Sequence, residues 1–308
     1  MDDGAWVVTG GNAGLGLECA RALLADDDRR VVLACRDPGR GAEAARALGE
    51  RASTMSLDLA SLASVRAFAH AARRELPPLR GLVCNAGVQV VNGVQRTQDG
   101  FEATFGVNHL GHFLLVRSLL DHIAPGGRVI VVSSGTHDPA QRTGMPAPRW
   151  TDPRWLARPE LDPDPTALAT DAEAGRRRYT TSKLANLLFV HELHRRLRAE
   201  GSTITALGFD PGMMPGSGLA RDYPAWQRVL WRWVLPVLRW FAPNVHSTEE
   251  SGRALARLAT DPLLATVSGR YFEGTREREP SAESQEPTLA AALWQASEAL
   301  TLTPHAEA

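Results

Sequence analysis

A short stretch near the N-terminus, residues 5–16, reads AWVVTGGNAGLG. Its first half is apolar and β-branched, which is typical of a buried strand, and an amphipathic helical pattern follows at 14–25. Glycines between a strand and a helix allow a tight turn, and the free N–H groups of the first helical turn then face an anion. The stretch therefore predicts a strand–loop–helix unit that binds the phosphates of a dinucleotide.

The same alternation continues along the chain. Further strand patterns lie at 31–34, 53–57, 81–84, 128–133, 203–209 and 270–272. Further helical patterns lie at 39–50, 61–75, 99–122, 179–200, 247–259 and 288–300. Strands that alternate with helices predict an α/β fold: a doubly wound, mostly parallel seven-stranded sheet with helices on both faces.

Composition predicts one domain over residues 1–308. Hydrophobic residues make up 44% and charged residues 22%, and the net charge of -1 gives no basic field for nucleic acid. The three cysteines lack disulfide or metal-ligand spacing, and we expect neither a signal peptide nor a membrane span. We therefore expect a cytoplasmic protein. A single lysine among 34 basic residues suggests a GC-rich bacterial source.

Two segments interrupt the alternation. Residues 135–178 are rich in Pro, Asp and Arg and have no clear period, which predicts a loop insertion. Residues 213–245 include a Trp-rich stretch that fits a lid over a bulky apolar substrate, with Trp226 and Trp231 as contacts. Packing on the core or in a dimer interface explains this stretch equally well. Peripheral contact with a membrane surface is a third interpretation. Pro236 argues against it, because a proline in the middle of the stretch interrupts a continuous interfacial helix.

The second strand pattern ends at Arg36, where the ribose 2′ group of a dinucleotide lies. An acidic residue there binds the hydroxyl of NAD, whereas an arginine accommodates the 2′-phosphate of NADP. Asp37 is acidic but lies one residue beyond the position at which an acidic residue would bind the NAD hydroxyl. Arg36 therefore favours NADP(H) over NAD(H); the alternative is a surface arginine without a role.

Tyr179 and Lys183 carry the chemistry. A spacing of four places them one turn apart on one helical face, and Lys183 is the only lysine of the chain. A phenol has a pKa near 10, too high for acid–base work at neutral pH, and a neighbouring ammonium lowers it by stabilising the phenolate. An arginine at 183 would not share a proton. The pair predicts proton donation by Tyr179.

Together these motifs resemble the short-chain dehydrogenase/reductase family, whose fold is of the Rossmann type. The resemblance covers most of the chain and implies a cofactor site at Gly10, Asn12, Gly14, Leu15, Gly16, Arg36, Asp58, Leu59, Asn85, Ala86, Gly87, Tyr179, Lys183, Pro211, Gly212 and Ser217. It also implies a catalytic serine, Ser134, and a proton-relay asparagine, Asn108. The resemblance suggests an oligomer, although the insertion could block the usual helix pairing.

The expected activity is NADPH-dependent reduction of a carbonyl group on a bulky apolar substrate. Ser134 would hydrogen-bond the substrate oxygen, and Asn108 would hold a water that feeds protons to Lys183. His109 and His112 have a spacing compatible with metal ligation, but no third ligand completes a set, so we expect no metal. A non-catalytic NADP(H)-binding sensor is the alternative from another class.

The 45-residue gap between Ser134 and Tyr179, with the sequences ACR, VNHLGHF and YTTSKLAN, resembles the branch of retinol dehydrogenases and light-dependent protochlorophyllide reductases. The C-terminal third is closest to the latter, which reduce a C=C bond. Those enzymes generally have a cysteine directly after the Pro-Gly turn. Met213 stands there in this chain, and we assign it to the substrate site. We therefore expect carbonyl reduction, with C=C reduction as the alternative.

Overall fold

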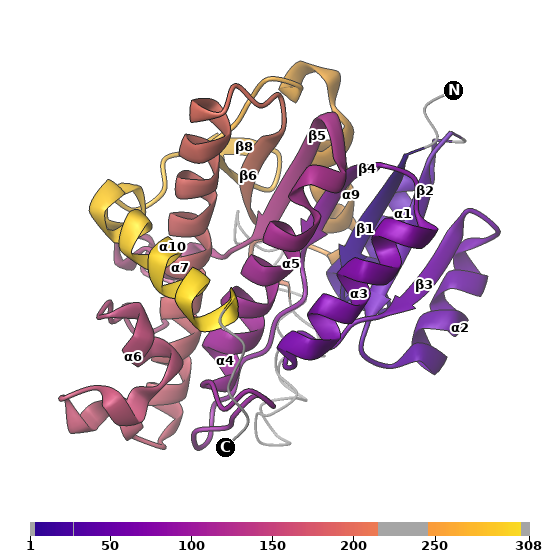
Figure 1. Ribbon diagram of the computed structural model, residues 1–308. Coiled ribbons are helices and arrows are strands. Elements are labelled where there is room, and N and C mark those ends of the chain that lie inside the picture. Colours follow the sequence, from indigo (N-terminus) through magenta and orange to yellow (C-terminus); the bar gives the residue numbers. More distant parts are fainter. Residues whose placement is uncertain (1–3, 27, 215–245, 303–308) are drawn as a thin grey trace.

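The computed structural model describes residues 4–26, 28–214 and 246–302 (Figure 1). Within this part of the chain the strands form one eight-stranded sheet of order β3-β2-β1-β4-β5-β6-β7-β8. The pairs are parallel from β3 to β7, and β8 pairs with β7 in the antiparallel sense. The doubly wound α/β class is confirmed.

The strands are β1 (Ala5–Thr9), β2 (Arg30–Cys35), β3 (Ala52–Ser56), β4 (Leu79–Cys84), β5 (Ile123–Val132), β6 (Thr205–Asp210), β7 (Arg270–Glu273) and β8 (Arg276–Arg278). The main helices are α1 (Gly14–Leu23), α2 (Pro38–Leu48), α3 (Leu62–Glu75), α4 (Ala103–Phe105), α5 (Gly111–Leu119), α7 (Ala172–Ala199), α9 (Thr248–Thr260) and α10 (Pro287–Leu302). A π-helical segment, η1 (Gly106–Leu110), joins α4 to α5.

Helices cover both faces of the sheet, and each face has its own apolar core. Side chains of α1, α2 and α9 pack on one face, and those of α3, α5 and α7 pack on the other, where α10 adds to the core by packing against α5 and α7. Strands buried on both faces read as unbroken apolar runs, as β1 and β2 do. In Figure 1 the yellow α10 lies across α7, far from it in sequence.

Three details differ from the sequence prediction. The sheet has an eighth strand among the described residues; β8 is three exposed polar residues long and carries no apolar signal. The helix expected over 99–122 begins at Ala103 and contains the π segment. The helix expected from 179 starts at Ala172, so residues 172–178 belong to α7 and not to an irregular insertion.

The rest of the insertion folds into short helical turns, and its composition explains them. The side chains of Asp138, Asp152 and Asp164 each accept a backbone hydrogen bond two residues on, and proline follows each of these aspartates. An Asp N-cap with proline at the first position starts a helix but does not prolong it. The role of the insertion stays a prediction. None of the described helices is long and apolar enough to span a bilayer.

Candidate active site

The candidate site residues gather at one edge of the sheet. The glycine loop follows β1, Arg36 follows β2, the Asn85 segment follows β4, Ser133 and Ser134 follow β5, and Pro211 follows β6. The carboxyl ends of parallel strands meet at this edge, which is where ligands bind in open α/β sheets. The predicted residues that the structure describes are therefore brought together from strands far apart in sequence.

The glycine loop has the geometry that an anion site requires. Gly10 and Gly14 have φ values of 64° and 55°, where a side chain would be strained. A Cβ on Gly16 would lie 2.6 Å from the Gly10 carbonyl oxygen, so α1 can approach β1 only with glycine there. Ala13 caps α1 without a side-chain hydrogen bond, which leaves the first N–H groups for a ligand. These features fit the pyrophosphate of a dinucleotide.

The other residues of the loop divide between surface and core. Asn12 is half-buried, whereas Leu15 is buried and packs in the core under the loop. Leu15 therefore supports the loop from below. Only its backbone is available for a cofactor.

A hydrogen-bond network joins the loop to the neighbouring strand ends. The Thr9 hydroxyl accepts from the backbone N–H groups of Asn85 and Ala86, each at 2.9 Å, and lies 2.9 Å from Nε2 of His112. Nδ1 of His112 lies 3.1 Å from the Asn108 carbonyl oxygen. Because a carbonyl only accepts, Nδ1 carries the proton and Nε2 accepts from Thr9. Burial lowers the His112 pKa to about 4, which keeps the ring neutral.

Asn108 is fully buried in the π segment. Its amide accepts from Val88 N–H at 2.8 Å and donates to the Val88 carbonyl and the Ser182 hydroxyl, both at 3.0 Å. A Cβ on Gly87 would lie 3.3 Å from the Asn108 oxygen and 3.8 Å from the Lys183 ammonium. Asn108 thus holds the Gly87 loop against α7; its part in a water relay stays a prediction.

Tyr179 and Lys183 lie together on α7, and both are buried. The Lys183 ammonium is 5.4 Å from the centre of the Tyr179 ring and donates to the Val132 carbonyl at 3.1 Å. Burial lowers the Lys183 pKa to about 8, against a smaller opposing effect of Asp210. The Ser133 hydroxyl donates to the Lys183 carbonyl at 2.8 Å, which fixes α7 to the end of β5 next to Ser134.

Ser134 is half-buried, and its hydroxyl accepts from Thr136 N–H at 3.3 Å. Its carbonyl accepts from Nδ1 of His137 at 2.7 Å. The predicted serine is therefore next in sequence to Ser133, whose hydroxyl bonds the Lys183 carbonyl. The structure also shows that His137 orients the loop that carries Ser134.

Arg36 is exposed just beyond β2. The neighbouring Asp37 side chain accepts from Arg40 N–H at 3.0 Å and caps α2. The Asp37 carboxylate thus caps α2, and the exposed Arg36 is the side chain at the end of β2 that can reach a bound cofactor. Asp58 accepts from Ala60 N–H at 3.0 Å and is half-buried. Leu59 is buried in the core, so only its backbone is available for a cofactor.

The turn after β6 contains the predicted Pro211 and Gly212. Gly212 has a φ of 73°, and the Pro211 carbonyl accepts from the Ser251 hydroxyl at 2.7 Å. Met213 is 41% exposed, and its place in the substrate site stays a prediction. The predicted residues Ser217, Trp226 and Trp231, and the lid region from 215 to 245, lie outside the described residues.

Sequence reasoning missed a carboxylate at the centre of the site. Asp210, the last residue of β6, is 2% exposed and accepts from Gly135 N–H at 2.7 Å, Gly212 N–H at 2.8 Å and the Tyr271 hydroxyl at 3.1 Å. Burial raises its pKa, which the two N–H donors and the hydroxyl oppose. An acidic residue that ends an otherwise apolar strand is the signal that could have found it.

His109, which the sequence offered as a metal ligand with His112, lies in the core. His109 is buried among aromatic rings, with Nε2 2.8 Å from the Ser297 hydroxyl, and burial lowers its pKa to about 3. Among the described residues, no three His, Cys, Asp or Glu side chains come together as metal ligands would.

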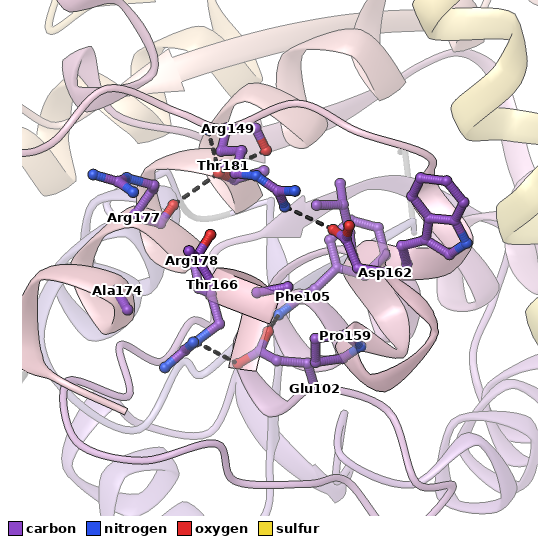
Figure 2. A pocket seen from close by; sticks show the side chains of 13 residues that line it. Glu102, Phe105, Arg149, Pro159, Asp162, Thr166, Ala174, Arg177, Arg178 and Thr181 are labelled. Atoms are coloured by element: carbon purple, nitrogen blue, oxygen red, sulfur yellow. Dashed lines mark hydrogen bonds and ion pairs between the residues drawn. The ribbon is translucent and has the colours of Figure 1, made fainter. Parts of the chain in front are cut away.

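An open pocket of about 560 Å³, solvent at its mouth included, lies between the insertion, α4 and the first turns of α7 (Figure 2). Its charged side chains are paired: Arg149 lies 2.7 Å from Asp162, and Arg178 lies 3.8 Å from Glu102. Neither Tyr179 nor Lys183 lines this pocket.

Comparisons with known proteins agree with this arrangement. The family model described as short chain dehydrogenase matches residues 5–144. Protochlorophyllide reductase A of Oryza sativa subsp. japonica is 38% identical over 97% of this chain and 81% of its own length. The corresponding enzyme of Daucus carota is 36% identical over 96% of this chain and 78% of its own length.

Solved structures show the same fold. An uncharacterised protein from Mycobacterium paratuberculosis is 31% identical with a TM-score of 0.72, and the match covers 98% of this chain and 96% of that one. A blue fluorescent protein from a metagenomic library, solved with NADPH, is 23% identical with a TM-score of 0.63, over 88% of this chain and 97% of its own. The chain therefore belongs to the short-chain dehydrogenase/reductase family of oxidoreductases and, within that family, is similar to protochlorophyllide reductases.

Proposed function

We propose that this protein is an NADPH-dependent reductase that acts on a carbonyl group of a bulky apolar substrate. The observation that carries the proposal is the buried pair of Tyr179 and Lys183, 5.4 Å from ring centre to ammonium, next to the serine-bearing end of β5. NADPH would supply the hydride when bound. The uncapped start of α1 would hold its pyrophosphate, and Arg36 its 2′-phosphate.

The chain's own groups would manage the proton. The Tyr179 hydroxyl would donate a proton to the substrate oxygen, and the Lys183 ammonium would stabilise the phenolate left behind. The Ser134 hydroxyl would hydrogen-bond the same substrate oxygen as negative charge develops there. Burial of Tyr179 and Lys183 supports this scheme, because charges interact more strongly where water is excluded.

A direct test follows the hydride itself. Wild-type protein is incubated with NADPH deuterated at the transferable position and a panel of aromatic ketones, aldehydes and retinoids. The proposal predicts oxidation of NADPH and an alcohol that carries deuterium on the former carbonyl carbon. NADPH binding without turnover of any carbonyl in the panel would refute the proposal and favour the sensor alternative.

Reduction of a C=C bond is a second candidate, favoured by the similarity to protochlorophyllide reductases over nearly the whole chain. Met213 follows the Pro-Gly turn and has no proton to donate, so we place carbonyl reduction first. Protochlorophyllide conversion under illumination separates the two candidates. Product formed only in light would exclude our first choice.

The substrate lid around Trp226 and Trp231, the cytoplasmic location, the bacterial source and a homo-oligomeric state stay predictions. The cofactor roles of Asp58, Asn85 and Ser217 stay predictions as well. The curated relatives quoted above are chloroplast proteins, whereas the mycobacterial structure is bacterial. Sedimentation of the purified chain, with and without NADPH, measures the oligomeric state.

A further inference from the structure

Asp210 joins three elements through one carboxylate. Oδ2 accepts from Gly135 N–H in the serine loop and from the Tyr271 hydroxyl on β7, and Oδ1 accepts from Gly212 N–H in the Pro-Gly turn. Asp210 and Tyr271 are 2% and 1% exposed, so water does not compete for these bonds. The three donors favour the ionised carboxylate against the effect of burial, and hydrogen bonds to an ionised carboxylate are among the stronger ones in proteins.

The peptide unit between Ser134 and Gly135 is held at both ends. Asp210 accepts from its N–H at 2.7 Å, and His137 donates from Nδ1 to its carbonyl at 2.7 Å. A Cβ on Gly135 would lie 3.0 Å from the Asp210 oxygen, so glycine allows the close approach. The orientation of this peptide plane determines where the Ser134 side chain points.

The Pro-Gly turn is held in the same way. Gly212 N–H is bound by Asp210, and the Pro211 carbonyl accepts from Ser251 on α9. Asp210 is therefore the one described side chain that hydrogen-bonds both the serine loop and this turn. A displacement of about 1 Å of a catalytic group can cost about 100-fold in rate, so such a link has consequences for turnover.

We propose that Asp210 is a positioning residue that fixes the Ser134 loop to the Pro-Gly turn, with Tyr271 holding its carboxylate in place. The proposal rests on the proposed function, because it presumes that Ser134 and the turn face the reacting groups. The charged and titratable groups around Asp210 are Lys183 on α7, Tyr271 and Glu273 on β7, and His137 after β5. Lys183 is the cation among them.

Amide hydrogen exchange tests the link without any need for turnover. In Asp210→Asn one side-chain oxygen remains where two accepted bonds before, so amide exchange should rise at residues 133–137 and at Gly212 and Met213; Pro211 has no amide hydrogen. The matched control is Glu273→Gln, whose residue pairs with Asp210 across β6 and β7 and lies 3.5 Å from Arg278. Unchanged amide exchange in Asp210→Asn would overturn the proposal, and this result would hold even if the wild type reduced none of the carbonyl substrates. Carbonyl reduction absent from the wild type would instead refute the proposed function.

Kinetics separate positioning from mere loss of structure. Asp210→Asn should lower kcat by about 10- to 100-fold, with Kd for NADPH changed by about three-fold at most. Removing an anion also lowers the pKa of neighbouring acids, so the fall of kcat at high pH should move to lower pH. Tyr271→Phe keeps the charge of Asp210 and the aromatic ring. It should lower kcat less than Asp210→Asn does, and the pH at which kcat falls should stay that of the wild type. Equal kcat and equal pH profiles for Asp210→Asn and Glu273→Gln would contradict the positioning role of Asp210. If Asp210→Asn does not fold, Tyr271→Phe provides the test instead, and an unchanged kcat in Tyr271→Phe would contradict that role.

Discussion

At the residue scale, Lys183 is a buried cation whose cost in stability its proposed role would explain. The only lysine of the chain is buried under Tyr179, and its pKa falls from 10.5 to about 8. The folded state therefore disfavours the charged form, which the proposed mechanism needs beside the phenol. A hydrophobic side chain would suit this position better, and selection for stability alone would not retain lysine there.

Replacing Lys183 with methionine should therefore stabilise the fold at neutral pH. A pKa lowered to about 8 means that the unfolded state binds an extra proton between about pH 8 and 10.5. Burial of the charged Lys183 therefore lowers the free energy of unfolding by about 3 kcal/mol below pH 8, and this loss disappears as the pH rises from 8 to 10.5. In Lys183→Met the Val132 carbonyl loses the hydrogen bond from Lys183 but keeps the one from the Asn186 amide.

Urea denaturation from pH 7 to 10.5 measures the difference in free energy of unfolding between wild type and Lys183→Met. We expect the variant to be the more stable protein at pH 7 and the difference to shrink above pH 8. Arg198→Met, an exposed change on the same helix, should show no such dependence. A difference independent of pH would contradict a depressed Lys183 pKa.

Arg36 should determine the choice of cofactor. Arg36→Ala should weaken NADPH binding by about 10- to 100-fold, since a charge-assisted hydrogen bond contributes about 1.5–3 kcal/mol. NADH, which lacks the phosphate, should bind as before. Fluorescence titration with both nucleotides measures this, with the exposed Arg46→Ala as control. Equal losses for NADPH and NADH would show that Arg36 does not contact the 2′-phosphate.

At the element scale, the strand–loop–helix unit could be predicted because all its determinants are local. Glycine spacing, the apolar strand and the amphipathic helix lie within residues 5–25, and the same holds for Tyr179 and Lys183 on one helix face. Asp210 carries a local signal as the acidic end of an apolar strand, but its contact with Tyr271 and the place of His137 beside them could not be predicted, since only the tertiary fold brings these residues together. The start of α7 at Ala172 and the three-residue β8 were also missed, because neither carries an apolar period.

The glycine loop makes a prediction about stability. Gly16→Ala should destabilise the fold by about 1–3 kcal/mol, because its Cβ would lie 2.5 Å from the Asn85 amide and 2.6 Å from the Gly10 carbonyl. Gly39→Ala, in the first turn of α2, meets only the flexible Asp37 carboxylate at 3.4 Å and should be nearly neutral. Thermal unfolding of both variants gives the comparison. Equal melting temperatures would show that α1 does not pack closely on Gly10 and Asn85.

At the scale of the whole molecule, α10 joins the C-terminal region to α7, the helix that carries Tyr179 and Lys183. Trp294 is 2% exposed. It packs edge-on against Phe113 of α5, 5.1 Å between ring centres, and stacks on Phe189 of α7 at 5.9 Å. The guanidinium of Arg196 lies 4.2 Å from its ring centre. The face of α5 and α7 opposite the sheet is thus covered by the chain's own last helix.

Trp294→Ala should lower the free energy of unfolding by about 3–5 kcal/mol, the usual cost of removing a buried indole. Leu263→Ala is the control, since Leu263 is 85% exposed and contributes little burial. Urea denaturation measures both. A loss below about 1 kcal/mol for Trp294→Ala would mean that α10 is loosely attached.

The central claim is proton donation by Tyr179 beside Lys183. The most direct measurement compares NADPH oxidation by wild type and Tyr179→Phe on a carbonyl substrate that the wild type reduces, with Thr180→Val, a buried neighbour on α7, as control. The account predicts a loss of kcat of about 100-fold or more in Tyr179→Phe, with unchanged NADPH affinity and a control near wild type. A Tyr179→Phe variant that binds NADPH normally and turns over at the wild-type rate would contradict it.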